Sequence, residues 1–126
     1  MKIIRRGINF VLFAALMLAV VLPAPAREIR HDIKECPAIA SIAAETYWMS
    51  YKGASLQDVL NYEAEQILSS NAHAVARSII FNNWNILNKI VYKPIFTYEE
   101  IIGDLIPAYK DLCVASNGVA LVGEEI

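Results

Sequence analysis

The chain of 126 residues has little of what most catalytic or metal-binding motifs require. It contains only two cysteines and two histidines, whereas structural zinc sites are usually built from paired motifs that supply four ligands. It also lacks a serine-centred elbow, a glycine-rich phosphate loop and a His-Glu zinc motif. We therefore expect no enzymatic activity, no metal ion and no other cofactor.

The few ligand-type side chains that lie close together do not change this expectation. His31, Asp32, Glu35 and Cys36 form a single cluster, and Cys36 is expected to be oxidised. His73 falls at a predicted helix start, where we expect it to be exposed or partly packed.

The paired carboxylates are also explained without catalysis. Glu63 and Glu65 are two positions apart, so their side chains should diverge on a helix. Glu99 and Glu100 fall in a predicted first turn, where negative charge complements the helix dipole.

The N-terminus has the three parts of a secretory signal peptide. Residues 1–9 carry three basic side chains, Phe10–Leu22 is an uncharged apolar run of 13 residues, and Ala24-Pro25-Ala26 fits a signal-peptidase site. The run is short for a membrane span, which needs about 20 residues. We predict that residues 1–26 are cleaved and that the protein is periplasmic or secreted. The alternatives are an uncleaved anchor and a twin-arginine signal.

The charge that remains after cleavage limits the possible partners. Three of the 11 basic residues lie in the signal peptide, which leaves 8 against 13 acidic residues and a net charge of −5. Nucleic-acid binding depends on Lys and Arg that neutralise phosphates. We expect the partner to be another protein or a second copy of the chain. A nucleic acid is not expected, and a membrane is expected only if the signal peptide is retained.

Cys36 and Cys113 are the only cysteines. An exported chain meets an oxidising compartment, where a pair of cysteines usually forms a disulfide. We predict this bridge, with two free thiols as the alternative.

Apolar residues recur at three- and four-residue spacing in four segments, which predicts an all-α fold, a small bundle of about four helices. The segments are Pro37–Lys52, Leu56–Leu68, Ala72–Tyr92 and Thr97–Cys113. Gly53 is expected to end the first helix and Ser55 to cap the start of the second. Asn83 falls inside the apolar face of the third, where it either bridges to a neighbouring helix or marks a kink.

The last helix has the sharpest local signals. Thr97 and Glu100 form a capping box, and Pro107 predicts a kink or a division into two short helices. We expect residues 27–35 to be an extended or frayed lead-in, 36–113 the helical domain and 114–126 a flexible tail, with no strands.

Several large aromatic side chains fall on faces that the helical period assigns to solvent. Protein interfaces are rich in such residues, and the alternative is that another helix or the tail covers them. The candidate partner surface consists of Glu45, Trp48, Tyr51, Lys52, Phe81 and Tyr92.

The order of these features resembles a group of small exported two-cysteine proteins of bacteria and their phages. The residues that carry the resemblance are Cys36, Ala40, Ala43, Lys52, Gly53, Leu56, Val59, Val91, Tyr92, Pro94 and Cys113. It covers Cys36–Cys113 and implies a helical fold and a disulfide, but no chemistry. Two features depart from the pattern, Pro107 and the run of asparagines at Asn82, Asn83, Asn85 and Asn88. The architecture is also similar, more distantly, to periplasmic immunity proteins that block secreted cell-wall amidases.

We therefore expect an exported, non-enzymatic helical domain that binds or inhibits another protein, as an immunity protein does. The alternative is a membrane-anchored periplasmic regulator of the envelope or of lysis, held by an uncleaved signal anchor. A third possibility is self-association through the helix face that carries Trp48.

Overall fold

The structure, a computed structural model, describes residues 27–90 and 93–122. The elements in chain order are β1 (Arg27–Arg30), the 3₁₀ helix η1 (Ile33–Glu35), α2 (Cys36–Tyr51), α3 (Leu56–Ala64), α4 (Ser70–Lys89), α5 (Tyr98–Ala115) and β2 (Val119–Val122). The predicted helical bundle is confirmed, with four α-helices in the described residues. The predicted signal peptide lies outside them. No helix within the described ranges is long and apolar enough to cross a membrane.

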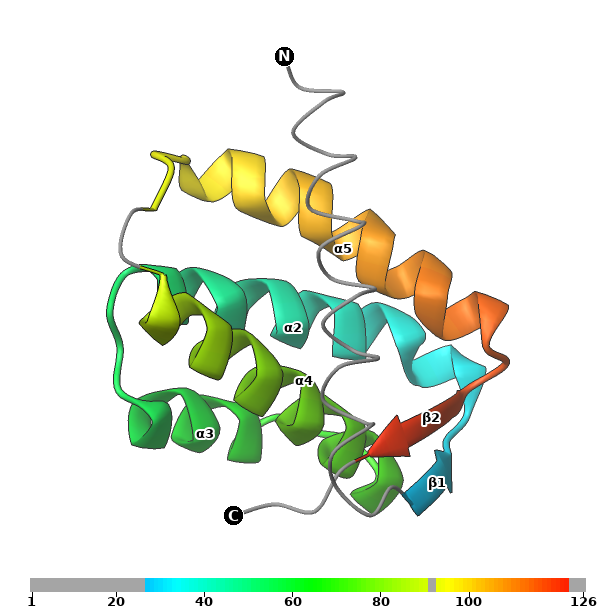
Figure 1. The fold of residues 1–126 in the computed structure, drawn as a ribbon. Coiled ribbons are helices and arrows are strands. Elements are labelled where there is room, and N and C mark those ends of the chain that lie inside the picture. Colours follow the sequence, from blue (N-terminus) through cyan, green and yellow to red (C-terminus); the bar gives the residue numbers. More distant parts are fainter. Residues whose placement is uncertain (1–26, 91–92, 123–126) are drawn as a thin grey trace.

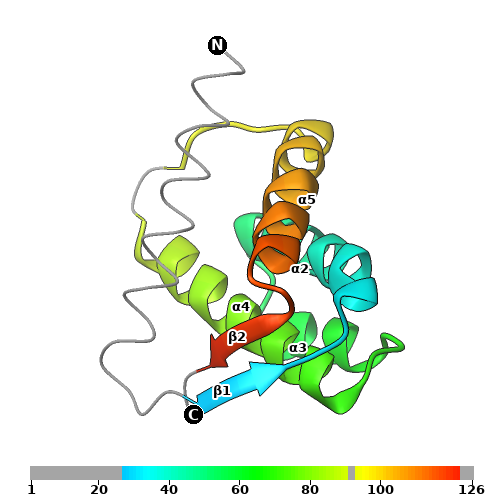
Figure 2. The same ribbon diagram turned by 90° about the vertical axis from the view of Figure 1, so that its right-hand side faces the viewer.

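Helix α2 is the centre of the bundle and lies between α5 on one side and α3 and α4 on the other (Figures 1 and 2). Pro37 occupies its first turn, where a missing N–H costs no hydrogen bond. The helix ends as predicted, because Gly53 takes a left-handed φ of +96° that a side chain would disfavour. The small or branched side chains of its buried faces are Ile39, Ala40, Ile42, Ala43 and Ala44.

Helix α3 is shorter than predicted. Ser55 caps its start by accepting a hydrogen bond from the backbone of Asp58 at 3.1 Å. The helix stops at Ala64, and the N–H of Gln66 bonds to the carbonyl of Glu63, which tightens the last turn. Ile67, which the period placed on the core face, is 99% exposed.

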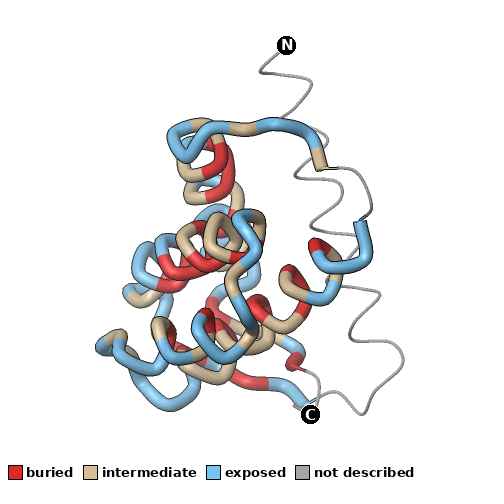
Figure 3. Tube along the Cα trace, turned by 90° about the vertical axis from the view of Figure 1, so that its left-hand side faces the viewer, coloured by how far each residue is buried: buried red, intermediate tan, exposed pale blue. Residues whose placement is uncertain are grey.

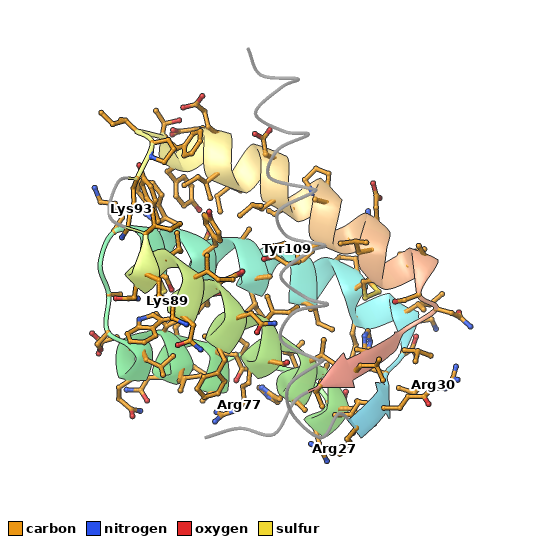
Figure 4. All side chains as sticks on the ribbon, in the orientation of Figure 1. Arg27, Arg30, Arg77, Lys89, Lys93 and Tyr109 are labelled. Carbon is orange, nitrogen blue, oxygen red and sulfur yellow. A yellow bond between two sulfur atoms is a disulfide. The ribbon has the colours of Figure 1, made fainter. Side chains whose placement is uncertain are left out.

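Helix α4 begins where Ser69 accepts a hydrogen bond from the backbone of Ala72 and ends at Lys89. The prediction extended it to Tyr92, but residues 91–92 lie outside the described part of the chain. Asn83 is buried inside its apolar face, and its side-chain amide donates to the hydroxyl of Tyr109 at 2.6 Å. The predicted polar bridge is therefore confirmed, and Tyr109 lies between α5 and the rest of the bundle (Figure 4).

Helix α5 begins with the predicted capping box, in which Thr97 and Glu100 each bond to the other's backbone N–H. It runs as one element through Pro107, so the alternative of two short helices is wrong. Pro107 is exposed. Its ring therefore lies on the solvent-facing side of α5, where it does not divide the helix.

The prediction of a flexible tail over 114–126 is wrong for the part that the structure describes. Helix α5 continues to Ala115, and β2 then pairs with β1 in an antiparallel ribbon in which Arg27 faces Val122. Asn117 and Gly118 turn the chain with φ values of 55° and 74°. The ribbon forms because Ile29 and Val122 are both buried against the helices. Residues 123–126 lie outside the described part of the chain.

The predicted disulfide joins Cys36 to Cys113, with Cα atoms 5.7 Å apart. It connects the first residue of α2 to the last turns of α5, beside the β1–β2 ribbon. Buried positions line the inner sides of the helices, while the outer sides are exposed (Figure 3).

Candidate functional site

The predicted partner surface corresponds to a group of side chains where the end of α2 meets the start of α5. We call this group the Trp48 cluster; it consists of Glu45, Trp48, Tyr51, Lys52 and Tyr98. Four of these five residues were predicted from the helical period of α2. They lie together because positions three and four apart share a helix face.

Aromatic contacts organise the Trp48 cluster. Trp48 stacks on Tyr51 with ring centroids 5.6 Å apart, and the ring of Tyr98 meets Trp48 edge-on at 5.5 Å. Both arrangements suit the quadrupoles of aromatic rings. The ammonium of Lys52 lies 5.4 Å from the Trp48 ring centre, within range of a cation–π interaction.

Hydrogen bonds fix the same rings. The Tyr98 hydroxyl donates to a carboxylate oxygen of Glu45, and this bond raises the pKa of Tyr98. The Tyr51 hydroxyl donates to the carbonyl of Pro94 at 2.6 Å and accepts from the N–H of Phe96 at 2.9 Å. Tyr51 thus holds the chain that leads into α5 against the end of α2.

The Trp48 cluster is partly covered and partly open. Trp48, Tyr51 and Glu45 are half-buried, Lys52 is exposed, and Tyr98 is 38% exposed. The alternative that another helix covers Trp48 is therefore correct for one side of the ring, since α5 supplies Tyr98.

Not every predicted surface residue belongs to this cluster. Phe81 is half-buried on α4 and takes no part in the described ring stacks around Trp48. Tyr92 lies outside the described residues. Tyr98 was missed, because only the fold brings the first turn of α5 to the last turn of α2; the capping box before it was the one available signal.

A second polar contact was also missed by sequence reasoning. Glu63 on α3 is 1% exposed, and its carboxylate pairs with Nδ1 of His73 on α4. Glu65 points to solvent, so the two carboxylates diverge as predicted, but the inward one is deeply buried. His73 is partly packed, as predicted. The pair links α3 to α4, with the carboxylate of Glu63 buried and the side chain of His73 partly exposed.

The ligand-type residues at the start of the domain separate into different contacts. Asp32 caps η1 by accepting from the backbone of Lys34 at 2.9 Å. Glu35 accepts from the backbone N–H and the hydroxyl of Ser69, and the backbone bond is the main reason why the pKa of Glu35 is lowered. His31 is buried, and its Nε2 lies 3.6 Å from Sγ of Cys113.

Comparison of the chain with protein-family models, with curated proteins and with solved structures found no match.

Proposed function

We propose that the protein is an exported, non-enzymatic binding module that sequesters or inhibits another protein through the Trp48 cluster, in the manner of an immunity protein. The observation that carries the proposal is a stacked, hydrogen-bonded and partly open set of aromatic rings where the end of α2 meets the start of α5. Tryptophan and tyrosine are the residue types that most often dominate the binding energy of protein interfaces.

The organisation of the Trp48 cluster supports binding at low entropic cost. Ring stacking and the bonds of Tyr98 and Tyr51 hold the aromatic side chains in place before any partner arrives. Rings that are already ordered lose little conformational freedom on association. The exposed Lys52 at the edge supplies a polar rim.

Charge supports a basic partner. With residues 1–26 removed, the chain carries 8 basic and 13 acidic residues. An acidic protein attracts a partner with a positive face, which raises the association rate at low ionic strength.

Export is the second part of the proposal. It is supported by the tripartite pattern in residues 1–26 and by the Cys36–Cys113 disulfide, because such bridges persist in oxidising compartments.

The test compares three forms of the tagged full chain, produced in the source cell and recovered after export. Trp48→Ala removes the central ring, and Ile67→Ala is the control, because it removes an apolar side chain that is 99% exposed outside the cluster. We expect wild type and Ile67→Ala to retain the same partner and Trp48→Ala to lose at least tenfold in affinity for that purified partner. Equal far-UV circular dichroism spectra establish that all three are folded.

A wild-type chain that is recovered alone and monomeric at every concentration would refute the binding role. Retention of the partner by Trp48→Ala would refute the choice of surface. Self-association through the same rings would instead appear in light scattering as a dimer that Trp48→Ala dissociates.

The alternative function is a membrane-anchored periplasmic regulator, which the apolar run Phe10–Leu22 favours. N-terminal sequencing of the exported chain separates the two. A first residue at Arg27 excludes the anchor, whereas an intact Met1 in the membrane fraction excludes the cleaved, freely diffusing form.

A further inference from the structure

We propose that reduction of the Cys36–Cys113 disulfide converts the junction of β1, α2 and α5 into a zinc-binding site formed by His31 and the two cysteine thiolates. The ligand atoms of the three residues all lie within 4.8 Å of one another. This proposal is independent of the binding role of the Trp48 cluster, which lies at the other end of α2.

The imidazole of His31 is oriented as a metal ligand would be. Its Nδ1 lies 2.9 Å from the backbone carbonyl oxygen of Asp32. A carbonyl oxygen only accepts hydrogen bonds, so Nδ1 carries the proton of the neutral ring, and in that tautomer Nε2 has the lone pair. Metal-binding histidines usually donate their other ring N–H to such a carbonyl or carboxylate. Nε2 lies 3.6 Å from Sγ of Cys113.

This separation already matches a zinc site. With bonds of about 2.3 Å to sulfur and about 2.0–2.1 Å to nitrogen, a tetrahedral zinc ion holds a sulfur and a nitrogen ligand about 3.6 Å apart. Two sulfur ligands of the same ion lie about 3.8 Å apart. The sulfur atoms of Cys36 and Cys113 are bonded to each other in the disulfide, so they must move apart after reduction, whereas Nε2 of His31 and Sγ of Cys113 are already at the required separation.

The backbone keeps the three residues together when the S–S bond is absent. The packing of α2 against α5 holds the two cysteine Cα atoms near 5.7 Å. The N–H of His31 bonds to the carbonyl of Gly118 at 2.9 Å, which fixes the histidine beside the end of α5. Rotation of the cysteine side chains is then sufficient to open the sulfur pair.

The chemistry requires a reductant of the dithiol class. A dithiol transfers two electrons and two protons to the Cys36–Cys113 disulfide. The dithiol is itself oxidised to a disulfide, and Cys36 and Cys113 become thiols. Binding of Zn²⁺ then displaces one proton from each thiol. Two thiolates and a neutral imidazole balance the charge of the ion, which suits a site where Cys36 is fully buried. Three protein ligands leave the fourth position for water.

The test uses the full chain, reduced anaerobically with a phosphine. Unlike a thiol reductant, a phosphine has no sulfur atom that could compete for zinc. We expect the reduced chain to bind one Zn²⁺ in competition with a chromophoric chelator, and the oxidised chain to bind none. Co²⁺ in place of Zn²⁺ should give the charge-transfer absorption of thiolate ligands. Zinc should also release two protons and slow alkylation of both thiols.

Variants at the two histidines give the matched comparison. Loss of a residue that only supports a metal ligand typically lowers metal affinity by about tenfold or more. Loss of the ligand itself should cost at least as much, so His31→Gln should lower the zinc affinity at least about tenfold. The control His73→Gln should bind as wild type does. A measurement on the wild-type chain does not depend on whether a variant folds. In the reduced wild type, zinc should shift the ring-proton resonances of His31 and leave those of His73 unchanged.

Three results would overturn the proposal. They are no binding by the reduced wild-type chain, equal binding by the oxidised chain, and equal affinity of the reduced wild type and His31→Gln. Binding to an unfolded chain would be recognised by unshifted His31 resonances together with a loss of helical circular dichroism, and it would overturn the proposal as well.

Discussion

Removal of the Cys36–Cys113 disulfide tests how much of the stability of this domain comes from restricting the unfolded chain. The two residues are 77 positions apart, so the bridge closes most of the described domain into one loop. On the chain-entropy model, a loop of this length lowers the entropy of the unfolded state by about 15 cal/mol/K, or about 4.5 kcal/mol at 25 °C. Domains of this size unfold with about 5–15 kcal/mol in total. The bridge therefore contributes roughly a third or more of the free energy of unfolding.

The double variant Cys36→Ala, Cys113→Ala should lose about 4–5 kcal/mol of unfolding free energy and lower the midpoint temperature by roughly 20 °C or more. The assay is guanidinium unfolding followed by far-UV circular dichroism. Alanine at the fully buried position 36 also removes a packed sulfur atom. The control is the wild-type chain reduced by a phosphine without metal, which keeps both sulfur atoms and should lose nearly the same amount.

The slope of the free energy against denaturant should rise when the bridge is absent, because an unlinked unfolded chain exposes more surface. A loss below about 2 kcal/mol in both samples would refute the reasoning, since native bridges in small domains typically contribute more. A large loss in the variant with little loss in the reduced wild type would assign the effect to packing around Cys36.

Three further substitutions test single contacts by urea unfolding. Tyr109→Phe removes the hydroxyl that the buried amide of Asn83 meets and should cost about 1–3 kcal/mol; a change under about 0.5 kcal/mol would show that the amide finds another acceptor. Thr97→Ala breaks the capping box of α5 and should cost about 1 kcal/mol, with the unfolding midpoint as the readout. Gly118→Ala places a Cβ against a backbone carbonyl at a φ of +74° and should cost about 1–3 kcal/mol. Gly103→Ala, at an open position inside α5, is the control and should gain up to about 1 kcal/mol; equal effects at the two glycines would refute the steric argument.

The parts of the fold that sequence reasoning found are those with local causes. A glycine that needs a positive φ ended α2, a serine hydroxyl started α3, and the Thr97–Glu100 box started α5. Each of these signals involves residues no more than three positions apart, so no knowledge of the tertiary structure is needed. The disulfide was also accessible, because two cysteines allow only one pairing.

The parts that sequence reasoning missed depend on partners far along the chain. The ribbon joins β1 to β2 from opposite ends of the domain, and four-residue strands carry too few residues for a clear alternation. The burial of Glu63 depends on His73, which the next helix brings to it. A charged residue is expected at the surface unless a partner is known, and the helical period alone names no partner.

The candidate surface shows the same division. Glu45, Trp48, Tyr51 and Lys52 come from one helix, so their common face follows from the period of 3.6 residues. Tyr98 completes the group from α5, and its contact with Trp48 follows only from the packing of α5 on α2.

The antiparallel pairing of Arg27 with Val122 has a practical meaning for engineering the domain. Both ends of the described chain lie side by side, so a short linker could join them, and new termini could be opened at the fully exposed Ile67 between α3 and α4. Such a circularly permuted chain would keep every helix and the disulfide intact. It would also leave the Trp48 cluster, at the end of α2 and the start of α5, clear of any fusion partner.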